Sequence, residues 1–229
     1  NQDGALSGGS HRFFTLHSRD WNVNRNNQPR LDINTVALDP EPAGLTDETV
    51  AFLEAKRKAG QPLASLADLV NATLIVTEEN QAQRELKSGV GTGDLSQLLD
   101  RFTTDPKQIR LERVNINTAP VSILAQVDGI DEALANTIVS ARQGLSPEAS
   151  RSIAWLLEES LLDADQFKQI EPFIAARSFQ FHIQVIGYAL PSGRYRVLES
   201  IVDLIGSEPR VLYIRDLTKL GVPYPFATR

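Results

Sequence analysis

Apolar residues recur every three or four positions over most of the chain, and they alternate with polar residues near its C-terminal end. The first spacing predicts amphipathic helices, and the second predicts strands that bury one face. The predicted helical segments are 45–59, 65–71, 95–102, 114–142, 152–159 and 163–171, and the predicted strands are 179–185, 195–203 and 211–214. We read 77–93 as a polar loop or surface helix and 103–113 as a linker. The pattern therefore predicts an α+β fold, in which a helical domain precedes an antiparallel β-meander.

The most informative helical segment is Val114–Arg142, which predicts two short helices joined by a tight turn. Asn117 and Thr118 offer side-chain oxygens that are expected to cap the first helix. Gly129 can adopt the positive φ that the turn needs, and Asp131 opens the second helix at the end where negative charge is favoured. The segment resembles a helix-hairpin-helix unit introduced by an I-N-T-A phrase.

The start of this segment has an earlier counterpart in the chain. Leu31–Asn34 reads L-D-I-N, Val114–Asn117 reads V-N-I-N, and each is followed by helical spacing. Such repetition predicts two related units, with Asn34 and Asn117 as structural residues that brace the start of each. We expect an N-terminal strand or loop segment over 1–30, a first helical unit over 31–102, a second over 103–176 and a β-sheet segment over 177–229.

An asparagine-rich stretch precedes the first unit. Asp20, Asn22 and Asn24 fall on alternate positions, and carboxylate and amide oxygens in such a pattern are ligands that calcium accepts. The pattern departs from an EF-hand loop, because Arg25 stands where glycine is needed and Leu31 where the bidentate acid should be. The simpler interpretation is a turn whose side chains bond nearby backbone, with a calcium site as the alternative.

Composition narrows the possible classes of protein. The chain has 229 residues, 41% of them hydrophobic and 23% charged, which is enough for one large or two modest domains. It contains no cysteine, so disulfide and thiolate chemistry are excluded. It also contains no run of eighteen apolar residues. Because it begins with Asn1, we expect a processed chain or an excised fragment, with any hydrophobic anchor upstream and membrane contact only through that segment.

The sequence offers little catalytic chemistry. None of the nucleophile, zinc, phosphate-loop or dinucleotide motifs is present, and the three histidines have no metal-binding partner nearby in sequence. We therefore expect a protein that is not an enzyme and takes no small-molecule substrate or cofactor, calcium excepted.

Nucleic-acid binding is the main alternative, since helix-hairpin-helix units often hold DNA phosphates. The charge argues against it: residues 114–175 hold nine acids and three bases, and phosphate affinity needs the opposite sign. Asp131 also places a carboxylate in the turn where a phosphate would approach. The acids are Asp128, Asp131, Glu132, Glu148, Glu158, Glu159, Asp163, Asp165 and Glu171, and the bases are Arg142, Arg151 and Lys168.

Three features together resemble general secretion pathway protein K, a minor pseudopilin of type II secretion systems. They are the doubled I-N phrase before a helical hairpin, the aromatic-to-serine phrase Phe173–Ser178 that leads into an extended segment, and the closing meander. The most specific pieces are Ile116–Pro120 and Ile153–Leu157 followed by Phe173–Ser178.

This resemblance implies SAM-like helix-hairpin-helix units set into a pilin-like body whose sheet is the meander. It further implies a non-enzymatic subunit at the pseudopilus tip, on the periplasmic side of the bacterial inner membrane. Its partners would be minor pseudopilins of the I and J types. The alternative is a DNA-binding module that resembles the competence protein ComEA, which shares the I-N-T-A hairpin.

Overall fold

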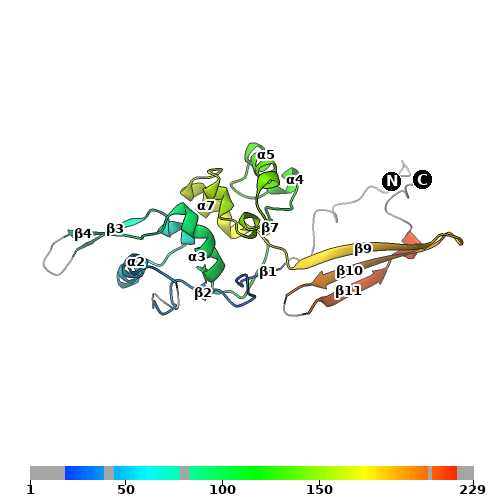
Figure 1. Cartoon of the computed structure of the whole chain (residues 1–229), viewed down its shortest axis with the longest axis horizontal. Helices are drawn as coiled ribbons and strands as arrows, with labels where there is room; N and C mark the ends of the chain where they lie inside the picture. Colours follow the sequence, from blue (N-terminus) through cyan, green and yellow to red (C-terminus); the bar gives the residue numbers. More distant parts are fainter. Residues whose placement is uncertain (1–18, 39–43, 78–82, 206–207, 221–229) are drawn as a thin grey trace. The chain divides into compact units, whose positions relative to one another are not determined.

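The computed structural model describes residues 19–38, 44–77, 83–205 and 208–220 (Figure 1). The chain divides into two compact units, one formed by Asn22–Arg177 and the other by Asn1–Trp21 with Ser178–Arg229. Six α-helices lie within the described residues, and antiparallel sheets accompany them, so the fold is α+β as predicted. None of the helices described is both long and apolar enough to cross a membrane.

The helices occur where the apolar spacing predicts them, and several begin at the expected cap. Thr46 Oγ1 accepts a hydrogen bond from Thr49 N at 3.2 Å, and Asp163 Oδ1 accepts one from Gln166 N at 2.8 Å. These caps satisfy amides that the first helical turn leaves without a partner. The helices are α2 (Asp47–Lys58), α3 (Leu95–Arg101), α4 (Val121–Leu124), α5 (Glu132–Ala141), α6 (Trp155–Glu158) and α7 (Ala164–Ile170).

Two short parallel strand pairs bracket the helices of the Asn22–Arg177 unit. β2 (Leu31–Asp32) pairs with β5 (Phe102–Thr103), and β7 (Val114–Asn115) pairs with β8 (Ile174–Ala175). Each pair joins the start of a helical stretch to its end, about 60 to 70 residues later in sequence. The I-N phrases thus begin in strands of two residues, which are too short to show a strand period in the sequence.

One apolar core runs through both helical stretches. Its fully buried side chains include Phe52, Phe102, Leu124, Ile138 and Trp155. The 3₁₀ turn at Leu66–Leu69 and α6 supply further apolar side chains to this core. Burial of these groups away from water is the main source of stability for this unit.

A β-hairpin replaces the polar loop or surface helix expected over 77–93, so that expectation is wrong. β3 (Thr73–Thr77) pairs antiparallel with β4 (Gln83–Lys87), and both are drawn in cyan to green at one end of Figure 1. Leu74 lies opposite Leu86, and both pack against the core, although Leu86 is surrounded by charged residues in sequence. A single apolar residue in β4 gives too weak a period to be recognised. The remaining short strands are β1 (Asp20–Trp21) and β6 (Ile109–Arg110).

The C-terminal residues form the predicted antiparallel meander. β9 (Gln180–Ala189), β10 (Arg194–Asp203) and β11 (Arg210–Asp216) lie in the order β11-β10-β9, so β10 is central. One face contains Val197 and Ile201, which are buried. By register, the opposite face carries large apolar side chains that are 37% to 64% exposed: Phe181, Ile183, Val185, Leu198, Val211 and Ile214.

Candidate functional site: the helical hairpin

The predicted hairpin lies between α4 and α5, with its turn at Asp128–Ile130. Gly129 has φ +88°, a backbone conformation that side-chain-bearing residues adopt at a cost. Asp131 is the N-cap of α5, and its Oδ1 accepts a hydrogen bond from Leu134 N at 2.7 Å. The carboxylate therefore occupies the amide end of α5, where an external anion would otherwise be favoured.

The expected capping of α4 by Asn117 and Thr118 is wrong. Pro120 is the N-cap of α4, and no side chain bonds there. The exposed Thr118 donates its backbone N–H to Asn115 O at 3.3 Å. The turn between β7 and α4 is thus closed by backbone bonds and by Asn115 Oδ1, which accepts from Asn117 N at 2.9 Å. The Asn117 side chain is left available for distant partners.

Asn117 joins three segments of its helical stretch. Its Nδ2 donates to Ser150 O at 2.6 Å and to Ala176 O at 2.8 Å, while its buried Oδ1 has no partner among the described residues. Asn34 makes an equivalent long-range contact, since its Nδ2 donates to Leu63 O at 3.1 Å and its Oδ1 accepts from Leu63 N at 2.8 Å. Both side chains satisfy backbone groups of distant loops, which sequence spacing alone could not show.

Arg142 also has a structural role. Its guanidinium donates to Ile116 O at 3.0 Å and to Ala119 O at 2.7 Å, so the end of α5 is tied to the segment before α4. Sequence reasoning placed Arg142 at a helix C-terminus but missed these acceptors, which lie 23 and 26 residues earlier. Two of the five guanidinium N–H donors are used in this way, which orients Arg142 toward the segment before α4.

The other two bases of the segment are engaged as well. Lys168 Nζ lies 3.0 Å from Asp165 Oδ1 and 3.2 Å from Asp68 Oδ1. The hydrogen bond to Asp165 raises the pKa of Lys168; burial opposes this rise, and the contacts with Asp68 add to it. Arg151 pairs with Glu148 at 3.3 Å. Of the three bases, Lys168 and Arg151 are therefore paired with acids, whereas Arg142 bonds carbonyl oxygens.

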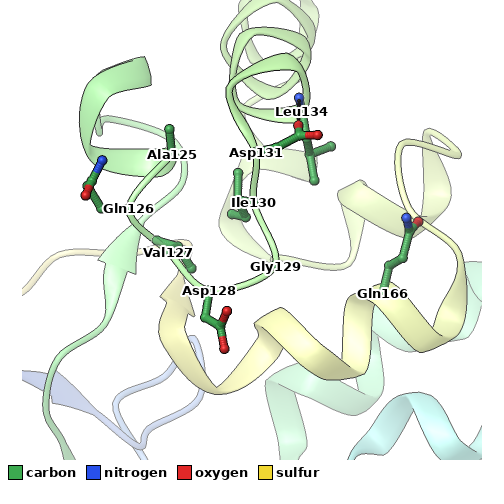
Figure 2. Close-up of a pocket in the computed structure, with 9 residues that line it drawn as sticks. All are labelled: Ala125, Gln126, Val127, Asp128, Gly129, Ile130, Asp131, Leu134 and Gln166. Carbon is green, nitrogen blue, oxygen red and sulfur yellow. Dashed lines mark hydrogen bonds between the residues drawn. The ribbon is translucent and has the colours of Figure 1, made fainter.

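An open pocket of about 620 Å³ lies beside the hairpin. Figure 2 shows the Asp128 carboxylate projecting from the turn, while Gln166 extends from α7 across from the beginning of α5. The lining contains two carboxylates and no basic side chain: Ala125, Gln126, Val127, Asp128, Gly129, Ile130, Asp131, Leu134 and Gln166.

A half-buried carboxyl links the two helical stretches. Ser65 Oγ, at the start of the Leu66–Leu69 turn, donates to Glu171 Oε2 next to α7. Burial raises the pKa of Glu171, whereas the Ser65 hydrogen bond and the nearby charges of Arg113 and Arg110 counteract the rise. This contact and the Lys168–Asp68 pair hold the same two elements together.

The asparagine-rich stretch forms a turn whose polar atoms are used inside the protein. Asn22 is buried, and its Nδ2 donates to Asp105 O at 2.7 Å and Lys107 O at 3.0 Å. Asn24 Oδ1 accepts from the backbone amides of Asn26 and Gln28, at 2.8 and 3.0 Å.

Cationic side chains also meet this turn. Arg177 donates to Val23 O and Asn24 O, and Arg30 Nη1 lies 3.5 Å from Asn22 Oδ1. A divalent cation at Asn22 and Asn24 would have to displace amide donors and sit near these guanidinium groups. Asp20 lies in β1. In the described part of the chain, no three histidine or acidic side chains form a cluster suited to a metal. Calcium binding at Asp20, Asn22 and Asn24 therefore stays the alternative interpretation of this stretch.

Comparison with known proteins recognises the same region. A family model described as a helix-hairpin-helix motif matches residues 110–175. No curated protein and no solved structure matches the chain. Residues 110–175 therefore carry a helix-hairpin-helix motif, a type of unit found in nucleic-acid-binding modules.

Proposed function

We propose that the chain is a structural subunit of a type II secretion pseudopilus and that it acts through protein–protein contacts without catalysis. The observation that carries this proposal is the exposed apolar face of the β9–β10–β11 sheet. Six large apolar side chains there are at least 37% exposed, and contiguous apolar surface of this kind marks sites of association.

The resemblance of the I-N-T-A hairpin and the closing meander to general secretion pathway protein K supplies the finer assignment. On this proposal the chain belongs to the pseudopilus tip, on the periplasmic side of the bacterial inner membrane. Minor pseudopilins of the I and J types are its partners. The two SAM-like units correspond to the two helical stretches that begin at Ile33 and Ile116.

Reconstitution of the full-length protein with I-type and J-type pseudopilins tests this proposal. Native mass spectrometry should detect a complex. The substitutions Ile183→Lys and Ile214→Lys should weaken it, because they place charge on the exposed sheet face. Ile75→Lys, at a side chain that is 67% exposed in β3, is the matched control and should leave the complex intact. Failure to form any complex would overturn the assignment.

The second candidate function is a DNA-binding module that resembles ComEA, and the motif at residues 110–175 favours it. The charge of the hairpin opposes it, since Asp131 occupies the α5 amides and Arg142 binds carbonyl oxygens. We expect no appreciable binding to duplex DNA at physiological salt. Sub-micromolar affinity in an anisotropy titration, with a steep decrease as salt rises, would favour the DNA-binding module instead.

A further inference from the structure

We propose that the hairpin pocket receives a lysine or arginine side chain from a partner protein. This inference rests on the proposed function, which supplies the partner, and it assigns the hairpin a contact separate from the sheet face. The pocket is bounded by the turn between α4 and α5 and by Gln166 of α7 (Figure 2).

The negative charge of the pocket favours a cation over an anion. Asp128 and Asp131 line it, and Glu132 follows directly at the first position of α5. Asp128 makes no hydrogen bond or ion pair with another described residue, and its side chain is exposed. A basic group entering the pocket would therefore meet a carboxylate whose charge is not already compensated by a described neighbour.

The apolar part of the lining fits the stem of a long basic side chain. Val127, Ile130 and Leu134 contribute to the pocket; Leu134 is half-buried and presents apolar surface there, whereas Val127 and Ile130 are almost fully buried. Lysine and arginine place their methylene groups along apolar surface and keep the charged end at a polar rim. A small inorganic cation would gain nothing from this apolar wall, whereas an aliphatic stem would.

The same geometry disfavours an anion. Backbone amides at a helix start usually attract phosphate or carboxylate groups. Here Asp131 Oδ1 already lies 2.7 Å from Leu134 N, so the protein supplies its own anion to α5. The hairpin thus offers a partner the opposite charge from that offered by a phosphate-binding hairpin.

The turn is held firmly enough to keep the pocket formed before a partner arrives. A Cβ built on Gly129 would lie 2.8 Å from Ile170 Cγ2 and 3.2 Å from Gln169 Cδ, so the turn packs closely against the end of α7. Ile130 N also donates to Val127 O at 3.0 Å, which closes the turn internally. Little conformational freedom is left to lose on binding.

Nuclear magnetic resonance titration of the ¹⁵N-labelled full chain tests the pocket directly. The probes are Nα-acetyl-lysine methylamide, Nα-acetyl-arginine methylamide, the uncharged norleucine counterpart and inorganic phosphate. We expect the two cationic probes to shift the amide signals of Gly129 and Ile130, and the other two to leave them unchanged. Asp128→Asn should weaken cation binding about fivefold, the scale of one exposed ion pair. Glu159→Gln, at an exposed acid outside the pocket lining, is the matched control and should bind like the parent.

The outcomes separate this inference from the proposed function. Signal shifts with phosphate, or no shift with either cation, would overturn the pocket assignment. In the reconstituted pseudopilin complex, Asp128→Asn should weaken association. If association is unchanged by Asp128→Asn, the pocket assignment fails while the proposed function stands. If cations bind the pocket but no pseudopilin complex forms, the proposed function fails instead.

Discussion

Arg57 and Arg142 make the same pair of hydrogen bonds in the two helical stretches of this chain. Arg57 Nη2 donates to Ile33 O and Val36 O, both at 2.8 Å, and Arg142 Nη1 donates to Ile116 O and Ala119 O. Each guanidinium lies at the C-terminal end of a helix, where its charge is also favoured. The two arginines therefore close equivalent turns after β2 and β7.

Loss of either pair of arginine hydrogen bonds should destabilise the fold. Arg142→Gln removes two hydrogen bonds from a charged group and should lower the free energy of unfolding by about 1.5–3 kcal/mol. Arg57→Gln should have a similar effect because its contacts are equivalent. Urea unfolding followed by circular dichroism measures both. Arg151→Gln, which breaks an exposed ion pair, is the control and should change stability by less than about 0.5 kcal/mol. Equal stability of Arg142→Gln and Arg151→Gln would show that the hydrogen bonds of Arg142 do not stabilise the fold.

Asn117→Ala should also destabilise the fold, by roughly 1–3 kcal/mol, because the carbonyl groups of Ser150 and Ala176 lose their donor. Thermal unfolding of Asn117→Ala and Asn34→Ala provides the measurement. Asn136→Ala is a suitable comparison, since that exposed side chain bonds only within its own helix, to Glu132 O. A variant at Asn117 that melts like the parent but loses partner binding would show a functional role instead.

Gly129→Ala combines two costs that a control can separate. The new Cβ requires positive φ and would meet Ile170 Cγ2 at 2.8 Å, so we expect a loss of about 2–4 kcal/mol. Gly193 has φ +64° and open space around its Cβ position, so Gly193→Ala bears the backbone cost alone, about 1–2 kcal/mol. Chemical unfolding of the two variants should give a clear difference. Its absence would mean that the hairpin does not pack against α7 as described.

Glu171 should impart a pH dependence to stability. Because burial raises its pKa above 4.5, the folded state holds this proton more tightly than the unfolded state does. The stabilisation that this proton contributes is fully present at pH values below the pKa of Glu171 in the unfolded state. It is lost as pH rises through the pKa of Glu171 in the folded state. As pH rises from 4.5, the melting temperature of the parent should therefore fall more steeply than that of Glu171→Gln. Identical slopes would show that Glu171 is not the group responsible.

Calcium provides a test of the asparagine-rich turn. The oxygen of Asn24 accepts two backbone amides, and Arg177 donates into the same turn. We therefore expect the same melting temperature in millimolar calcium and in chelator. A higher melting temperature in calcium than in chelator, with the difference absent in Asn24→Ala, would instead establish the calcium site at Asp20, Asn22 and Asn24.

Local features of this chain could be read from the sequence because their physical causes are local. Helix starts at Thr46, Ser65, Asp131 and Asp163 follow from side chains that bond amides two or three residues away. The turn at Gly129 follows from the backbone freedom of glycine, and strands β9 and β10 of the meander follow from the alternation of apolar and polar residues.

The tertiary structure decided everything that depends on a distant partner. Strands of two residues, such as β7 and β8, have no period to read and exist because segments about 60 residues apart meet. Asn117 does not cap its neighbouring helix, because its side chain reaches the carbonyl groups of residues 33 and 59 positions away. The charge of the hairpin was visible in the sequence. The sequence did not show whether this charge is accessible to a partner. Accessibility depends on which basic side chains bond carbonyl oxygens and neighbouring acids, and the packing of the core determines those contacts.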